Sequence, residues 1–269
     1  MRAKIRFLFL ILLLCHFCLS EISPKKGSKS EFSEIKSSSQ TTLPDSFDFY
    51  TDSDYTACTP QVKEQEKCGG CYAFAGTTTL AVRRCKVTGT FTDLSPEDII
   101  ACGYQTGGCE GGSSLDTLMY LEIFGTVSEA CMPYESGEGS PGECNWSTRC
   151  TAGTDNTRYY CKQGSTTGVV ERDRMKLEIY ENGPLLTFMT AYPDLFDYES
   201  GVYRTDGLNE DESGGHAVVI HGWGIQDGTD YWVVQNSWGA DWGINGHFWI
   251  DMDDDKSEAG SMGMFCIPE

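Results

Sequence analysis

An odd number of cysteines behind an apolar leader is the feature that most narrows the folds open to this chain. The sequence has 13 cysteines, of which Cys15 and Cys18 lie in the leader and eleven follow it. In an oxidising compartment, an odd cysteine indicates a free thiol or an intermolecular bridge. One reactive thiol and five disulfides account for all eleven, but this arithmetic does not say which cysteines pair.

The leader, residues 1–20, is typical of a secretory signal peptide. Three basic residues precede an unbroken apolar run, Phe7 to Leu14, and small residues follow before a cleavage point. The run is shorter than the roughly 20 residues that span a bilayer, and no later segment is apolar enough to span. We therefore expect entry into the secretory pathway, with no membrane anchor. The destination is either secretion or a lysosome- or vacuole-like compartment.

The formal net charge is -20. Such a chain offers no basic surface for a nucleic acid or an anionic membrane. The acidic composition would keep the protein soluble in an acidic compartment, where many carboxylates lose their charge. We expect no nucleic-acid partner.

The pattern along the chain predicts an α+β fold. Residues 21–42 hold too few apolar side chains to fold alone, so we interpret them as a linker or short propeptide. Residues 43–269 are long enough for one large domain or two small ones. Helical patterns dominate from about 57 to 165, and strand patterns dominate from about 166 to 269.

Four helices are expected. The first runs from Cys71 to about Arg84, and the second begins at Ser95-Pro96, which supplies an N-cap and a proline at the first helical position. The third covers Leu115 to Gly125, and a short fourth helix covers Lys176 to Tyr180. After Pro184 the expected strands are Leu185–Thr190, His216–His221, Tyr231–Gln235 and His247–Ile250. Asp227-Gly228 is typical of a hairpin turn.

Three short motifs carry the chemistry. Cys68-Gly69-Gly70-Cys71-Tyr72-Ala73-Phe74-Ala75, preceded by Gln65, fits a nucleophilic cysteine at the start of a helix. Far downstream lie Gly214-Gly215-His216 and then Asn236-Ser237-Trp238-Gly239. Taken alone, Cys68-x-x-Cys71 is also typical of a redox pair or half a zinc site. In this order, the motifs resemble the papain family of cysteine peptidases from about Leu43 onward.

The resemblance implies a papain-like fold, with a helical left domain, a strand-rich, β-barrel-like right domain, and the active site in the cleft between them. It implies Cys71 as nucleophile, His216 as proton donor and Asn236 as the side chain that orients the imidazole. Trp238 would cover that hydrogen bond at the substrate-binding cleft. The Gln65 side chain and the Cys71 backbone N–H would form the oxyanion hole. No cofactor or metal is implied. The expected partners are protein or peptide substrates and protein inhibitors that enter the cleft.

Cys109-Glu110-Gly111-Gly112 also resembles a family segment. Its glycines, Gly111 and Gly112, would let a substrate backbone pair strand-fashion, although a tight turn is the alternative. The resemblance further implies a disulfide between Cys68 and Cys109.

The flanking sequences are similar to the cathepsin B branch. In that branch, a pair corresponding to Cys58 and Cys85 brackets the active-site helix, and a histidine pair in a cysteine-rich insertion holds the substrate's terminal carboxylate. The corresponding segment here, residues 135–160, has no histidine. Because this histidine pair is missing, we expect an endopeptidase. The chain also has Gly70 where the family usually has Ser or Ala, and Tyr72 in place of Trp, but neither difference touches the reacting groups. The alternatives are an exopeptidase of the same family, an inactive papain-fold binding protein, or a disulfide oxidoreductase.

Other features have simpler interpretations. His221 lies at an odd offset from His216 and should face the other side of its strand. His247 is expected at the surface, and the aspartates at 251 and 253–255 are expected at a solvated hairpin tip, since they lack the spacing of a calcium loop. Asn145 is a candidate glycosylation site.

Overall fold

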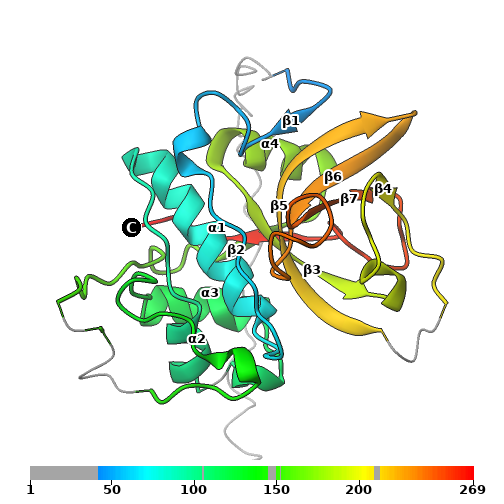
Figure 1. Ribbon diagram of the computed structural model, residues 1–269. Coiled ribbons are helices and arrows are strands. Elements are labelled where there is room, and N and C mark those ends of the chain that lie inside the picture. The colour runs from blue at the N-terminus through cyan, green and yellow to red at the C-terminus, as the bar shows by residue number, and fades with distance from the viewer. Residues whose placement is uncertain (1–41, 105, 145–149, 152, 209–212) are drawn as a thin grey trace, which may run out of the picture. The chain divides into compact units, whose positions relative to one another are not determined.

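The computed structural model describes residues 42–104, 106–144, 150–151, 153–208 and 213–269. The signal-peptide prediction and the Asn145 glycosylation site therefore lie outside the described residues, as does nearly all of the segment at 21–42. After one short strand, β1, the chain forms three helices, α1 to α3, and the other strands of a mixed sheet follow together with one further helix, α4 (Figure 1). No helix among the described residues combines the length and apolar character that a membrane span requires.

Helix α1, Cys71–Thr88, runs through the middle of the protein. Most of its side chains are buried, and burial overrides the poor helix propensity of its threonines. Thr77 lies inside the helix and donates from its hydroxyl to the Ala73 carbonyl oxygen at 2.8 Å. The helix extends past the expected end at Arg84 and stops at Gly89, whose φ of 72° is the left-handed conformation of a glycine cap.

A serine hydroxyl just before each of the two following helices accepts a backbone N–H from its first turn. Helix α2, Glu97–Cys102, begins where the Ser95 hydroxyl accepts the Asp98 N–H at 3.2 Å. Helix α3, Ser114–Ile123, begins where the Ser113 hydroxyl accepts the Asp116 N–H at 3.2 Å. Ser113 is the N-cap of α3, whereas the N-cap position of α2 is Pro96, one residue later than the predicted Ser95.

Helix α4, Arg172–Asn182, is longer than the predicted segment of residues 176–180. Only Met175 and Ile179 are fully buried, and they are spaced by one turn. The other residues of this helix are mostly charged or polar, so hydrophobic periodicity alone underestimated the length of the helix. It ends before Gly183, which has a φ of 108°.

Eight strands form the sheet in the order β2-β8-β3-β5-β6-β7-β4, with β1 paired to β5. They are β1 Phe47–Asp48, β2 Thr167–Val169, β3 Leu185–Ala191, β4 Val202–Tyr203, β5 Gly214–Gln226, β6 Thr229–Gln235, β7 His247–Asp251 and β8 Gly263–Phe265. All pairs are antiparallel except β4 with β7. The predicted hairpin joins β5 to β6, and both turn residues, Asp227 and Gly228, have positive φ.

The two faces of β5 contribute to two different cores. Ala217 and Val219 pack with the helices, whereas Val218 and Ile220 pack into the core on the other side of the sheet. A strand buried on both faces reads as a continuous apolar run, which matches this sequence. Since β5 also carries His216, the catalytic candidate is held by a strand that is packed on both sides.

Five disulfides link the described cysteines, and Cys71 is the one described cysteine left as a thiol. Cys68 is bonded to Cys109 and Cys58 to Cys85, as the family resemblance implied. The remaining bridges are Cys102–Cys144, Cys131–Cys150 and Cys161–Cys266. The last bridge ties the C-terminal segment to Cys161, which precedes the strand-rich part of the chain. The expected arithmetic of one thiol and five disulfides is confirmed.

Two surface predictions were wrong. Of the four aspartates assigned to a solvated tip, Asp253 and Asp255 are exposed as predicted, but Asp251 and Asp254 are only 8% and 4% exposed. Asp254 accepts backbone N–H groups of Thr205 and Lys256, each at 3.2 Å, so its burial satisfies the turn instead of exposing a charge. His247 is partly buried, with its ring 5.1 Å from that of His221.

Candidate active site

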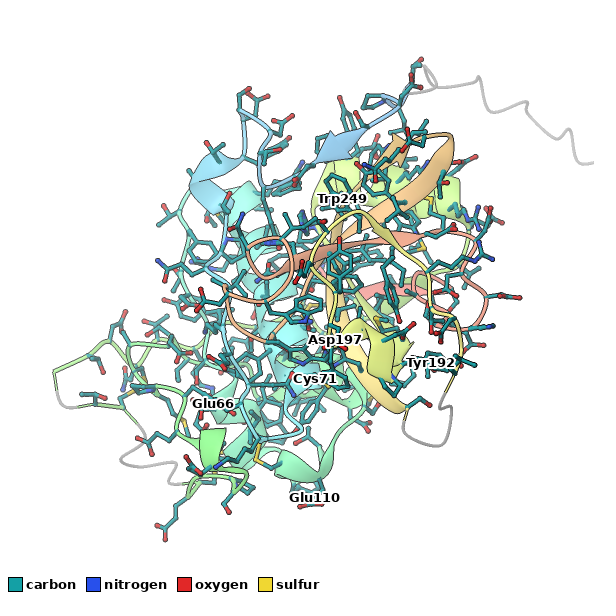
Figure 2. All side chains as sticks on the ribbon, turned by 45° about the vertical axis from the view of Figure 1, so that its right-hand side comes forward. Glu66, Cys71, Glu110, Tyr192, Asp197 and Trp249 are labelled. Carbon is teal, nitrogen blue, oxygen red and sulfur yellow. A yellow bond between two sulfur atoms is a disulfide. The ribbon has the colours of Figure 1, made fainter. Side chains whose placement is uncertain are left out.

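A cleft of about 570 Å³ is lined by residues from both parts of the chain. The helical part supplies Gln65, Cys71, Gly111 and Gly112, and the strand-rich part supplies a wall that includes His216 and Trp238. In Figure 2, Cys71 lies between Glu66 of the helical part, to its left, and Tyr192 of the strand-rich part, to its right. The predicted site residues that line the cleft are thus brought together from a stretch of sequence that extends from Gln65 to Trp238.

Cys71 is the first residue of α1 and is 9% exposed. Burial raises the pKa of its thiol, while hydrogen bonds from the backbone of Ala217, Tyr72 and Cys71 itself act in the opposite direction. Ala217 directly follows His216 on β5, so the thiol lies against the segment that carries the imidazole. A helix start and these N–H groups are the features that favour a thiolate over a thiol.

His216 is held by a hydrogen bond and a stacked ring. Its Nε2 lies 2.7 Å from Asn236 Oδ1, which also accepts the Ser237 N–H at 2.8 Å. Because Oδ1 is the acceptor, Nε2 carries the proton of this bond, and Nδ1 is the ring nitrogen left for proton transfer. Trp238 stacks on the imidazole with ring centroids 4.9 Å apart, so it covers the bond. Burial lowers the pKa of His216 to about 4, against the raising effect of Asn236.

The Gln65 side chain is fixed at both ends of its amide. Oε1 accepts the Ser237 hydroxyl at 2.6 Å, and Nε2 donates to the Cys68 carbonyl oxygen at 2.9 Å. An amide nitrogen carries two N–H groups, so one remains for a ligand in the cleft. Ser237 bonds both Gln65 and Asn236, a role that the sequence interpretation did not assign.

The two glycines of the Cys109 segment have different reasons to be glycine. Gly111 has a φ of 95°, which side chains rarely adopt. A Cβ on Gly112 would lie 2.7 Å from the Tyr72 ring and 2.3 Å from the Thr106 carbonyl oxygen. The bare backbone of Gly112 is exposed in the cleft, as strand-like pairing with a peptide requires.

Comparison with known proteins decides the family. Residues 43–266 match the family model described as papain family cysteine protease. The chain belongs to the papain family. This peptidase is 37% identical over 217 residues to the Cathepsin B-like CP3 of Giardia intestinalis, covering 79% of this chain and 70% of that protein. It is 32% identical over 255 residues to a gut-specific cysteine proteinase of Caenorhabditis elegans, covering 86% and 77%.

Solved structures agree with this assignment. A procathepsin B from Trypanosoma congolense superposes with a TM-score of 0.76 at 30% identity, covering 86% of this chain and 79% of that one. The protein is therefore a cathepsin B-like cysteine peptidase with the α+β fold of that family.

Several cleft residues were missed by the sequence interpretation. Phe188, Ala191 and Phe196 form part of the wall beside His216, and Glu66 and Glu110 lie on the helical side. Glu66 and Glu110 adjoin the motif residues Gln65 and Gly111, so adjacency in sequence was the available signal for them. His221 is not among the lining residues. It is 1% exposed, and its Nδ1 lies 2.9 Å from Asp48 Oδ1.

Proposed function

We propose that this peptidase is an endopeptidase that acts through a Cys71 thiolate and a His216 imidazolium. One observation carries the proposal: the single described thiol lies at a helix start in the same cleft as a histidine that Asn236 holds by Nε2. The oxidoreductase alternative is not favoured, because Cys68 is bonded to Cys109 and not to Cys71. An inactive binding protein would have no use for this arrangement.

The chemistry follows from the geometry. The Cys71 sulfur attacks the scissile carbonyl carbon, and the oxyanion accepts the second Gln65 N–H and the Cys71 backbone N–H. His216 donates its Nδ1 proton to the leaving amine, which gives an acyl-enzyme. Water then attacks the thioester while His216 accepts a proton, and cleavage of the carbon–sulfur bond restores the thiolate.

The endopeptidase proposal is supported by the contacts of the insertion. Arg158 is the basic side chain there that the structure describes. It donates to the Phe124 and Gly125 carbonyl oxygens and lies 3.0 Å from the buried carboxylate of Asp98. Arg158 is therefore committed to the helical core. Arg149 lies outside the described residues.

The start of the insertion is also fixed by contacts with the helical part, and these contacts do not involve a group that would bind a substrate's terminal carboxylate. Glu97, buried in α2, accepts the backbone N–H of Glu135 and of Ser136 at 3.1 Å each, and that of Gly142 at 3.2 Å. Together with the Cys102–Cys144 bridge, these bonds tie the segment to α2.

A free substrate C-terminus should therefore give no advantage. One peptide, prepared as its carboxylate and as its amide, is expected to be cut at internal bonds with similar kcat/KM, with products identified by mass. Stepwise loss of dipeptides from the carboxylate form alone would instead establish an exopeptidase.

The pH dependence of kcat/KM should be bell-shaped. Burial disfavours each charge by itself, raising the pKa of Cys71 and lowering that of His216 to about 4, so each charge depends on the other for stabilisation. The active form of the pair holds one proton, on His216. On the acid side, activity is lost when a second proton binds to the pair and converts the Cys71 thiolate to a thiol. On the alkaline side, activity is lost when the His216 imidazolium loses its proton.

Asn236→Ala sharpens this prediction. The Asn236 hydrogen bond raises the pKa of His216, so its loss should move the alkaline limb to lower pH and reduce kcat/KM. A wild-type profile that simply rises toward the free-thiol pKa of about 8.5 would contradict the ion pair.

We further propose that the protein acts in the secretory pathway, as a secreted or lysosomal enzyme, on protein substrates, and that protein inhibitors bind in the same cleft. The five disulfides support an oxidising environment.

A further inference from the structure

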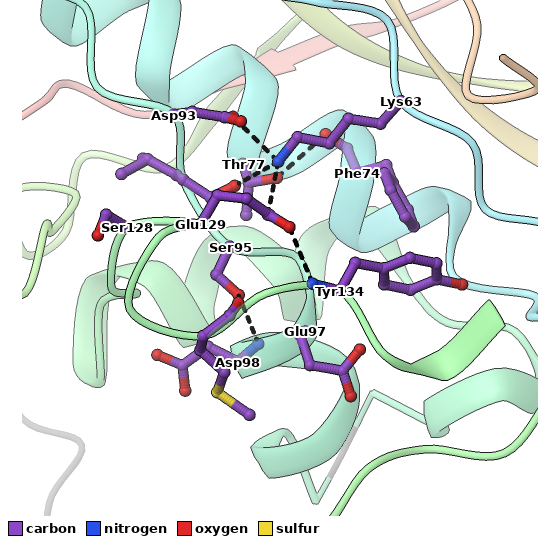
Figure 3. A network of polar contacts seen from close by, with 12 residues as sticks. Lys63, Phe74, Thr77, Asp93, Ser95, Glu97, Asp98, Ser128, Glu129 and Tyr134 are labelled. Carbon is purple, nitrogen blue, oxygen red and sulfur yellow. Dashed lines mark hydrogen bonds and ion pairs between the residues drawn. The ribbon is translucent and has the colours of Figure 1, made fainter. Parts of the chain in front are cut away.

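The chain segment around Gln65 is bonded to the helical part through the carboxylate of Glu129. Glu129 Oε2 accepts the Lys63 ammonium at 2.7 Å, and Glu129 Oε1 accepts the Tyr134 N–H at 2.8 Å (Figure 3). Lys63 also donates to the Leu94 carbonyl oxygen at 3.0 Å and lies 2.9 Å from Asp93 Oδ1. Its side chain is 18% exposed, so these bonds are only partly open to water.

Tyr134 closes the ring of contacts. Its hydroxyl donates to the Gln65 backbone carbonyl oxygen at 2.6 Å. Its ring packs edge-on against Phe74 of α1, with centroids 4.9 Å apart. Burial raises the pKa of Tyr134, as do the charges of Glu97 and Glu66, so the hydroxyl keeps its proton and remains a donor.

The opposite edge of the segment is bonded to the strand-rich part. The Gln65 N–H donates to the Ser237 carbonyl oxygen at 2.8 Å, and the Gly239 N–H donates to the Lys63 carbonyl oxygen at 3.1 Å. The oxyanion candidate is therefore held by both parts of the protein: Ser237 bonds the backbone N–H of Gln65, and Tyr134 bonds its backbone carbonyl oxygen.

The conformation of Glu66, the next residue, explains why hydrogen bonds to the Gln65 carbonyl oxygen matter. Glu66 has a φ of 51°, a left-handed conformation that costs a non-glycine residue energy unless its surroundings hold it. The Gln65 carbonyl belongs to the peptide plane that enters Glu66. The same carbonyl oxygen also accepts the Cys68 N–H at 3.2 Å. Without the shorter Tyr134 hydrogen bond, this longer bond would be left to hold the carbonyl, so the Gln65 backbone and the side chain that it carries would be fixed less firmly.

We propose that Tyr134 is a positioning residue for the oxyanion site. It acts through its hydrogen bond to the Gln65 backbone, and its own position is fixed by the hydrogen bond from its N–H to Glu129. This inference rests on the proposed function, because it assigns Tyr134 a role in stabilising the oxyanion of that reaction.

Tyr134→Phe removes the hydroxyl and keeps the ring. We expect kcat for a peptide substrate to fall about 10-fold, a part of the roughly 10²–10³ that one oxyanion donor is worth, with KM little changed. Alkylation of Cys71 by iodoacetamide displaces iodide from a methylene carbon and forms no oxyanion. Its rate constant should therefore stay within about twofold of wild type.

A double-mutant cycle separates this role from general destabilisation. In a Gln65→Ala background, Tyr134→Phe should cost less than about twofold, because the group it positions is gone. Glu129→Gln should show the same pattern and serves as the test variant if Tyr134→Phe does not fold. Tyr198→Phe is the matched control, since it also loses a hydroxyl bond to a backbone carbonyl, at 2.6 Å to Gly201, and should retain wild-type kcat.

Three results would overturn the proposal: an unchanged kcat, an equal loss in both backgrounds, or alkylation that slows in parallel with hydrolysis. The last would mean that Tyr134 acts on the nucleophile helix through Phe74. Failure of the proposed function looks different, because wild type would then show no turnover that depends on Cys71.

Discussion

Replacing Cys71 with serine is expected to abolish peptide hydrolysis while the protein stays folded. A serine hydroxyl at this position is not ionised by a neighbouring imidazolium, so the attacking group is lost although its position is kept. The loss should approach the roughly 10⁶-fold in kcat that follows deletion of a nucleophile from a serine peptidase. The measurement is kcat/KM of purified Cys71→Ser against wild type on one fluorogenic peptide.

Thermal unfolding of both proteins is the control. The thiol makes no disulfide, and the exchange of sulfur for oxygen removes little volume, so the unfolding midpoints should agree closely. Substantial residual turnover in a preparation free of wild-type enzyme would falsify the assignment of Cys71.

Gln65→Ala should lower kcat by about 10²–10³ without a comparable change in KM, because an oxyanion donor acts mainly in the transition state. Glu199→Gln, at an exposed residue that is not among those lining the cleft, should keep kcat near wild type. Iodoacetamide should alkylate Cys71 equally fast in wild type and both variants. A loss in Gln65→Ala seen only as a higher KM would point to substrate binding in place of oxyanion stabilisation.

The cleft could be anticipated from the sequence because its chemistry is carried by short motifs. Cys71 at a helix start and the Gly-Gly before His216 are local sequence signatures. Their order along the chain reduced the number of folds that the sequence could have. The longer strands were predicted for a similar reason, since β3, β5 and β6 are apolar runs ended by strong turns such as Asp227-Gly228.

What the sequence missed depends on partners far along the chain. Helix α4 presents only two buried side chains, Met175 and Ile179, so its pattern was too sparse to define its length. Asp254 looks like a surface residue until the Thr205 N–H, 49 positions away, is placed against it. Acidic side chains in a row read as solvated because sequence does not reveal which backbone donors they satisfy.

The supporting residues of the site were missed for the same reason. Ser237 bonds Gln65 across 172 positions, and Tyr134 bonds it across 69. No periodicity or spacing links such residues before the chain is folded. The proposed reacting groups can thus be predicted from motifs, whereas the residues that contact and orient them become apparent only from tertiary contacts.

The most direct test of the account is a thiol titration of the folded, unreduced protein with iodoacetamide, followed by peptide mass mapping and a peptidase assay of the same samples. We predict one alkylated thiol per chain, at Cys71, with activity lost in proportion to the label. Full labelling of Cys71 with activity retained, or inactivation that tracks a label on another cysteine, would contradict the central claim that Cys71 is the nucleophile.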